Sequence, residues 1–201
     1  LLPMVAASIA TAALGAVLGY ASSVVYVIGL AAVATGLTAG ATVSVVSLML
    51  DGRLSRTALG QALVAVLVGW SSAQVAEDQM FRAHWTEDFA AAQQAAAGVD
   101  PASGIGPDEL VFFATGADAA LSAETRRLVG FDGPIARWLL RADAGVRLIG
   151  PASGGRGLAV GRVGALIWVV LEILLAALVA RTLLRRVRRV ALGDSSASYE
   201  S

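Results

Sequence analysis

The apolar stretch between Gly161 and Val190 is the feature that most limits how this chain can fold. It is bracketed by Arg162 and Arg181, and the eighteen residues between these arginines contain a single charged residue, Glu172. As an α-helix, this segment is about 27 Å long, close to the thickness of the hydrocarbon core of a bilayer. The stretch therefore predicts a transmembrane helix with one carboxylate near the membrane midplane.

Composition places the whole chain among integral membrane proteins. Hydrophobic residues make up 57% of the 201 residues, charged residues only 15%, and the mean hydropathy is +0.72. Soluble domains typically carry about 25% charged residues. All fifteen basic residues are arginine, and arginine without lysine in a chain rich in alanine and glycine is typical of a GC-rich bacterial genome. We therefore predict a protein of the bacterial cytoplasmic (inner) membrane.

Four transmembrane spans are expected. Residues 1–50 contain no charge and as one helix would be about 75 Å long, more than twice the thickness of a bilayer. They must form two spans, and we place the turn at the least apolar point, residues 20–23. The predicted spans cover residues 2–20, 24–49, 57–75 and 158–183. The first three form a transmembrane region over residues 1–76, and the predicted fold class is an all-α integral membrane protein.

Residues 77–157 are interpreted as a small helical cap between the third and fourth transmembrane helices. The third helix is expected to continue beyond the membrane to about residue 97, because Phe81, Trp85 and Phe89 recur every four residues. This spacing makes an apolar stripe along one side of a helix whose other side is charged. Such a stripe needs a partner.

The partner is expected from two or three short helices over residues 108–150. Ser122 is a candidate N-cap for a helix that Gly130 ends. Asp132 is a candidate N-cap for the next, with Pro134 in its first turn. Apolar side chains of these helices would cover the aromatic stripe.

The distribution of arginines predicts the topology. Five arginines follow the fourth span: Arg181, Arg185, Arg186, Arg188 and Arg189. Positive charge at the ends of spans stays in the cytoplasm. Counting back through four spans places the loop 51–56, with its two arginines, in the cytoplasm, and residues 77–157, with eleven carboxylates against seven arginines, outside. Both termini are thus predicted to be cytoplasmic, and residues 184–201 to form a tail that is basic and then disordered.

Small residues recur at four-residue spacing on several spans. Such rows let helix backbones approach closely where lipid supplies no hydrophobic driving force. The rows are Ala7, Thr11, Gly15 and Gly19 on the first span and Ala32, Gly36, Gly40 and Ser44 on the second. On the fourth span, Gly161, Ala165, Ala176 and Ala180 share the helix face of Glu172. We interpret them as helix-packing faces. The alternative is that an alanine-rich composition produces such rows by chance.

Glu172 is the first candidate functional residue. A carboxylate at the centre of a span costs about 2.5–3.5 kcal/mol on insertion scales and by default indicates function. It would serve as a proton or cation site, or contact a pigment or lipid headgroup. The alternative is a protonated side chain hydrogen-bonded to a hydroxyl such as that of Thr38, Thr42 or Ser44.

A second candidate is a weak metal site formed by Glu77, His84 and Asp88. Spacings of seven and four place the three on one side of a helix, with Glu87 beside them. A histidine with carboxylates is a possible ligand set for a divalent metal. The alternative is an ordinary solvated helix face. This alternative is favoured because the chain has only one histidine to act as a ligand.

The arginines after the fourth span are the third candidate. On a helix that continues from the membrane they would contact anionic lipid headgroups, at about 1 kcal/mol per arginine near the surface. Their role in topology explains them without nucleic acid, which is not an expected partner. The expected partners are membrane lipids and other membrane subunits or further copies of the chain.

Absent residue types exclude several chemistries. The chain has no cysteine for thiol redox chemistry or thiolate metal sites, no lysine for a Schiff base, and one histidine where a membrane haem commonly needs two. We expect no cofactor and assign no catalytic residue. The leading hypothesis is a non-catalytic accessory or assembly subunit of a larger membrane complex, packed through small-residue faces. The alternative is a small transporter or ion-conducting oligomer that uses Glu172, and a membrane enzyme ranks third.

Overall fold

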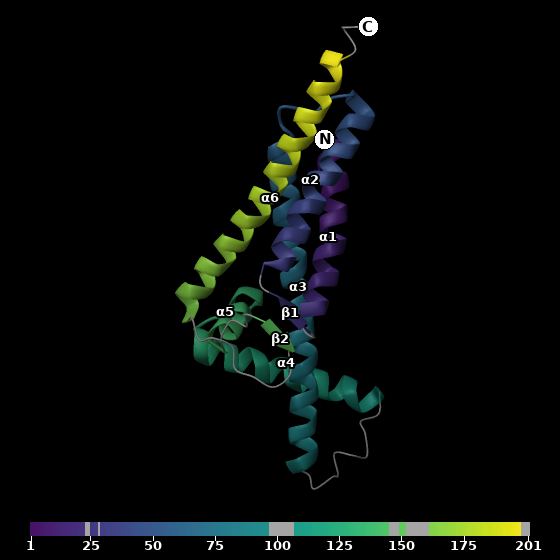
Figure 1. Cartoon of the computed structure of the whole chain (residues 1–201). Coiled ribbons are helices and arrows are strands. Elements are labelled where there is room, and N and C mark those ends of the chain that lie inside the picture. Colours follow the sequence, from purple (N-terminus) through teal and green to yellow (C-terminus); the bar gives the residue numbers. More distant parts are fainter. Residues whose placement is uncertain (23–24, 28, 97–106, 145–148, 152–160, 198–201) are drawn as a thin grey trace.

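The computed structural model describes residues 1–22, 25–27, 29–96, 107–144, 149–151 and 161–197 (Figure 1). The elements in chain order are α1 (Leu2–Ser22), β1 (Val25–Val27), α2 (Leu30–Asp51), α3 (Ala58–Ala96), α4 (Pro107–Val129), α5 (Pro134–Ala144), β2 (Ile149–Pro151) and α6 (Gly161–Ala197). Four of the helices, α1, α2, α3 and α6, are long and apolar enough to cross a membrane. The prediction of an all-α membrane protein with four transmembrane helices and a helical cap is confirmed.

The four long helices form two parallel pairs, α1 with α3 and α2 with α6. Along the first pair, Gly15 faces Gly69 and Gly19 faces Ala73. Along the second pair, Gly36 faces Ala176 and Gly40 faces Ala180. Residue numbers therefore increase in the same direction along both helices of each pair. First and third spans, and second and fourth spans, cross a membrane in the same direction, so this pairing fits four consecutive crossings.

The interior of the bundle is built from small side chains. The largest fully buried apolar side chains are Val43 and Val66. Alanines with no exposed surface fill most of the remaining space: Ala7, Ala39, Ala62, Ala65 and Ala180. Small residues at the contacts let the helix backbones come close together, which is how transmembrane helices gain packing energy in lipid.

Hydroxyl groups add hydrogen bonds between α1 and α3. The Thr11 hydroxyl lies 2.7 Å from the carbonyl oxygen of Ala65, and the Ser72 hydroxyl donates to the carbonyl oxygen of Ala12 at 2.8 Å. Thr11 has no exposed surface. Each such bond across a pair of membrane helices contributes about 0.6 kcal/mol on average.

The second span begins at Leu30, six residues later than the predicted start at residue 24. The residues just before it form β1, which pairs with β2 in an antiparallel ribbon whose central register is Tyr26 opposite Gly150. Valine and tyrosine favour the extended conformation, and the pairing strand lies more than 120 residues away in the sequence. Gly29, at a φ of 73°, makes the turn from the ribbon into α2, in a conformation that glycine adopts at no steric cost.

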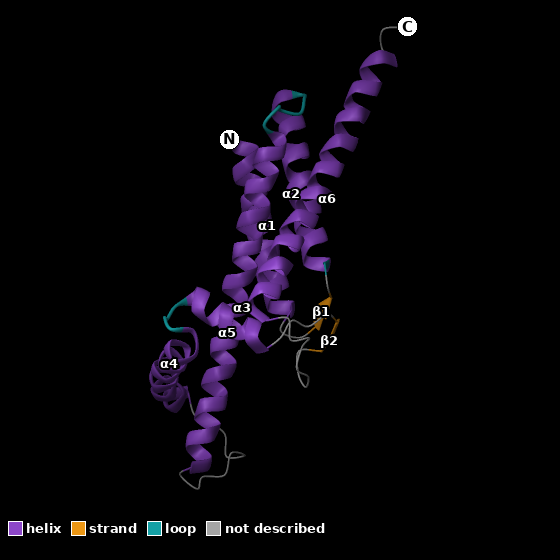
Figure 2. Ribbon diagram, turned by 90° about the vertical axis from the view of Figure 1, so that its left-hand side faces the viewer, coloured by secondary structure: helices purple, strands orange, loops and turns teal. Residues whose placement is uncertain are grey.

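The cap is formed by the second half of α3 together with α4 and α5, which lie across one end of the bundle (Figures 1 and 2). The expected N-cap at Ser122 is wrong, because this residue lies inside α4, a single 23-residue helix. Gly130 follows the end of α4 with a φ of 92°, as its predicted role requires. Pro134 is the first residue of α5.

The last helix is longer than expected. The arginines were expected on a helix that continues from the fourth span, and disorder was expected from residue 192, but α6 runs without a break from Gly161 to Ala197. Extending an existing helix needs no new nucleus, so the helix continues beyond the leucine- and arginine-rich residues 183–191. The predicted start of this span at residues 158–160 lies outside the described residues.

Candidate functional site

An ion pair at the start of the cap joins α3 to α5. Arg137 donates from Nε to Asp78 Oδ1 at 3.0 Å and from Nη2 to Oδ2 at 2.8 Å. The two side chains are only 13% and 12% exposed. The hydrogen bonds that Arg137 donates to Asp78 raise the pKa of Arg137 above its ordinary value. A bidentate pair of this kind fixes distance and orientation together.

A second contact lies one helical turn further along α5. Arg141 Nη1 lies 4.0 Å from Glu77 Oε2, and its guanidinium is 5.8 Å from the centre of the Phe81 ring. Burial lowers the pKa of Arg141, against the opposing effect of Glu77. Arginine over an aromatic face is a favourable cation–π arrangement. The two arginines of α5 therefore fasten this helix to α3 directly beyond the membrane span.

The aromatic stripe of α3 is covered by α4. Trp85 Nε1 donates to the carbonyl oxygen of Ala117 at 3.2 Å. A Cβ at Gly116 would lie 3.3 Å from the Phe89 ring, so these two helices are in close contact there. The stripe thus serves as the interior of the cap.

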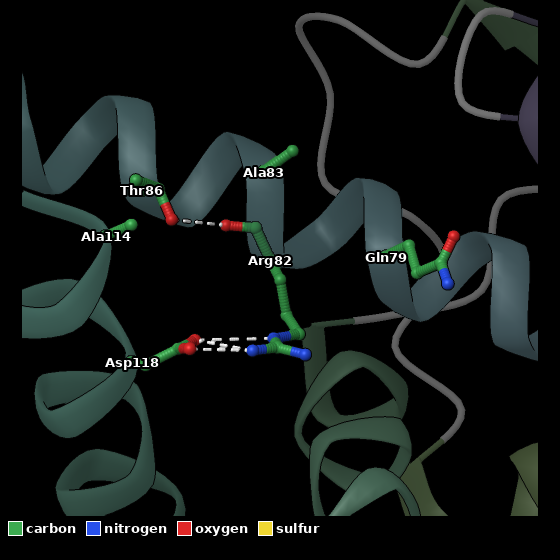
Figure 3. A pocket seen from close by; sticks show the side chains of 6 residues that line it. All are labelled: Gln79, Arg82, Ala83, Thr86, Ala114 and Asp118. Atoms are coloured by element: carbon green, nitrogen blue, oxygen red, sulfur yellow. Dashed lines mark hydrogen bonds and ion pairs between the residues drawn. The ribbon is translucent and has the colours of Figure 1, made fainter. Parts of the chain in front are cut away.

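A shallow depression lies between α3 and α4, beside this contact (Figure 3). It encloses about 210 Å³ and is lined by Gln79, Arg82, Ala83, Thr86, Ala114 and Asp118. Arg82 and Asp118 point toward each other across it and form a bidentate ion pair, with Nη2 2.7 Å from Oδ2. The only two charged groups of the lining thus neutralise each other, and the lining offers no nucleophile with an adjacent base.

The residues of the weak metal site are not gathered into one. Glu77 contacts Arg141, and the His84 ring nitrogen Nδ1 lies 2.8 Å from the carbonyl oxygen of Met80. Asp88 is exposed on α3. Within the part of the chain that the structure describes, no group of three or more histidine, aspartate or glutamate side chains could hold a metal ion.

Comparisons with protein-family models, curated proteins and solved structures find no match to this chain. The geometry of the chain itself therefore carries any functional conclusion.

Glu172 lies on α6 one helical turn before Ala176, the residue that packs against Gly36 of α2. It is half-buried. The offset between the two helices places it at the level of Ala32 on α2. The three hydroxyl groups predicted as its alternative partners, Thr38 among them, lie about two to three turns further along α2.

The predicted packing residues meet within the chain. A Cβ at Gly36 would overlap the backbone carbonyl of Ala176, and a Cβ at Gly40 would lie 3.2 Å from the Ala180 Cα atom. On the other pair, a Cβ at Gly15 would overlap the carbonyl oxygen of Gly69. These faces hold the bundle together and are occupied by helices of the same chain.

The arginines near the end of α6 are exposed: Arg181, Arg185, Arg186, Arg188 and Arg189. The helix that carries them continues past the ends of α1 and α2 (Figure 1). They are therefore free to reach lipid headgroups at one membrane surface.

The turn between α4 and α5 contains a carboxylate with a depressed pKa. The Ser122 side chain, the Gly133 N–H group and the nearby Arg126 and Arg137 all lower the pKa of Asp132, in that order. A depressed pKa means that Asp132 contributes to stability above the pKa of an unfolded aspartate, about 3.9. The contribution is lost as the pH falls through the lower, folded pKa.

We expect Ser122→Ala to raise the pKa of Asp132 toward its ordinary value, because the largest cause of the depression is removed. The measurement is the pH titration of the Asp132 carboxyl carbon by NMR in detergent micelles. Ser122→Thr keeps a hydroxyl and should retain most of the depression. An unchanged titration in Ser122→Ala would contradict this assignment.

Sequence reasoning missed the Asp78–Arg137 pair, although a signal was present. Two adjacent carboxylates follow the third span directly, and α5 carries two arginines four residues apart, at 137 and 141. Matching doublets of opposite charge on two helices indicate a double ion pair. The sequence did not show that these helices meet.

Proposed function

We propose that this protein is a non-catalytic accessory or assembly subunit of a larger membrane protein complex, and that it docks through its helical cap. The observation that carries the proposal is an exposed surface on the second half of α3, beside the aromatic stripe. Its exposed residues are His84, Glu87, Asp88, Ala91, Ala92 and Ala95. We call this the outer face of α3. Small side chains at its distal end allow close approach of a partner helix.

The rigidity of the cap supports a docking role. Because α3 is a single 39-residue helix, the outer face is continuous with a membrane span. The Asp78–Arg137 pair and the Trp85 hydrogen bond hold α5 and α4 against the same helix. A preorganised surface loses little conformational freedom on binding, which favours affinity.

The small-residue faces take a supporting part in this proposal. We first expected them to pack against other subunits, but within the chain they already contact one another. Docking is therefore assigned to the cap. The proposal places the chain in a bacterial cytoplasmic membrane, with both termini in the cytoplasm and the cap outside, and the exposed arginines of α6 support that orientation.

The experiment is gentle detergent extraction of the native membrane, followed by native mass spectrometry of every species that carries this chain. We expect co-migration with other polypeptides at a fixed stoichiometry. Ala91→Arg, on the outer face, should release those polypeptides. Ala123→Arg is a matched change at an exposed position of α4 and should retain them. Recovery of the chain only as a monomer or homo-oligomer would overturn the proposal.

A second candidate function is transport or ion conduction by an oligomer, and Glu172 favours it. This residue is the only charged one between Arg162 and Arg181, and it lies half-buried one turn from the α2–α6 contact. Intramembrane carboxylates typically mark ion or proton pathways.

For that function, Glu172→Gln is expected to abolish flux in proteoliposomes while leaving the size of the assembly unchanged, because the amide keeps the shape and removes the titratable charge. Glu124→Gln, in α4, makes the same substitution outside the spans and should leave flux intact. Unchanged flux in Glu172→Gln would rule this function out.

A further inference from the structure

The corner between α4 and α5 exposes three large apolar side chains within eight residues. Leu128 is 46% exposed, Phe131 45% and Ile135 69%. We call these three residues the apolar corner. Single exposed apolar residues are ordinary, but a cluster at one turn indicates a surface that contacts something less polar than water.

A hydrogen bond fixes the height of the apolar corner relative to the membrane. Arg162 Nη2 donates to the carbonyl oxygen of Leu128 at 3.3 Å. Arg162 lies in the first turn of α6, and the apolar part of that helix starts at the next residue, Val163, which is 72% exposed. The apolar corner therefore lies level with the beginning of the fourth span.

The arrangement of the cap agrees with this height. Figures 1 and 2 show α5 beside the first turns of α6 and α4 lying across the end of the bundle, whereas α3 extends further from the bundle than either. The apolar corner thus lies beside the first turn of α6. It continues the outward apolar surface of α6, where Leu166 and Ile167 are also exposed.

Basic side chains flank the apolar corner on the same turn. Arg126 and Arg127, at the end of α4, have side chains that are 66% and 69% exposed; Arg127 pairs with Glu124 at 2.6 Å, and Arg126 lies 3.9 Å from Asp132. Apolar side chains next to arginines are typical of segments that lie in the membrane interface, where the apolar groups enter the acyl boundary and the guanidinium groups reach the phosphates. A protein partner would not need this match in height with the start of a span.

We infer that the apolar corner inserts into the interfacial region of the lipid bilayer, as a second membrane contact of the cap beside its covalent links to α3 and α6. Leu128, Phe131 and Ile135 enter the boundary between headgroups and acyl chains, and the guanidinium group of Arg126 contacts lipid phosphates. The contact does not depend on the proposed subunit function. It holds the cap flat against the membrane, so that the outer face of α3 projects away from it.

The test uses site-directed spin labels on the full chain in liposomes of mixed zwitterionic and anionic lipid. Because the chain has no cysteine, each introduced cysteine gives a unique label. Ile135→Cys is compared with Leu174→Cys, exposed in the middle of α6, and with Ala92→Cys, exposed near the end of α3. The quantity measured is the ratio of collision rates with oxygen, which concentrates in lipid, and with a water-soluble nickel chelate.

We expect the ratio at Ile135 to lie several-fold above that at Ala92 and below that at Leu174. A ratio equal to that at Ala92 would place the apolar corner in water and overturn the inference. A label that neither reagent reaches would also overturn it, because a protein surface, from a second copy or a partner, would then cover the corner. Phe131→Cys gives an independent reading should the label at Ile135 prevent reconstitution.

Discussion

Gly36→Ala is expected to lower the free energy of unfolding of the bundle by about 1–3 kcal/mol or more, the range for overpacking a close contact. The added Cβ would overlap the carbonyl oxygen of Ala176 and lie 3.0 Å from its Cα atom. Both are backbone atoms of a membrane helix, so they cannot turn aside as a flexible side chain can. Relief requires α6 to move away from α2, which also weakens the contact between Gly40 and Ala180.

The measurement is reversible unfolding in mixed micelles with increasing SDS, followed by circular dichroism. Gly60→Ala is the matched control, because Gly60 is exposed on α3 and nothing lies within 4 Å of a Cβ built there. Replacing a helical glycine with alanine gains about 1 kcal/mol in propensity. The two alanine substitutions should therefore have opposite signs, and equal stability of the two variants would contradict the close α2–α6 contact.

Much of the bundle follows from the sequence, but the pairing of its helices does not. A row such as Gly36 and Gly40 reveals which side of a helix is small, and small sides pack. It does not reveal which other helix fits there, because both α3, at Gly69, and α6, at Ala176, offer small residues. Which helices pair depends on how far each is shifted along its neighbour in the folded bundle. The same limit applies to the ribbon, whose strand at Val25–Val27 pairs with residues in another part of the chain.

In the cap too, the sequence predicts the faces of a helix but not the residues that contact them. The spacing of Phe81, Trp85 and Phe89 predicted an apolar stripe that needs a cover, and α4 supplies it. The charged residues beside the stripe were harder to interpret. Glu77 was assigned to a weak metal site on the spacing of its own helix, while its contact, Arg141, lies on a helix that begins 57 residues later. Residue spacing indicates which side chains share a face of one helix, but it does not indicate which other helix contacts that face.

Asp78→Ala is expected to lower the free energy of unfolding by about 3–5 kcal/mol, the typical loss when one member of a buried ion pair is removed. The substitution leaves the guanidinium of Arg137, only 13% exposed, without its bidentate partner. Asp132 Oδ1, 3.9 Å from Arg137 Nη1, offsets part of the loss, so the lower end of the range is expected. The measurement is the same unfolding titration, with the cap monitored through the fluorescence of an introduced label at Ile135→Cys.

The Arg82–Asp118 pair provides the control that separates burial from geometry. It is bidentate and at least as short, with Nη2 2.7 Å from Oδ2, but its side chains are 44% and 52% exposed. Water already solvates these groups, so Asp118→Ala should cost only about 0–1 kcal/mol. Equal losses in the two variants would contradict the role assigned to burial.

The double variant Asp78→Leu with Arg137→Met removes both charges at once. Replacing a buried pair with apolar side chains of similar volume is often neutral or stabilising, so most of the stability lost in Asp78→Ala should return. A double variant as unstable as the single one would mean that Arg137 acts through contacts other than Asp78. Recovery would mean that the loss in Asp78→Ala comes mainly from the unpaired buried guanidinium group of Arg137. An apolar contact between α3 and α5 would then stabilise the cap as well as the ion pair does.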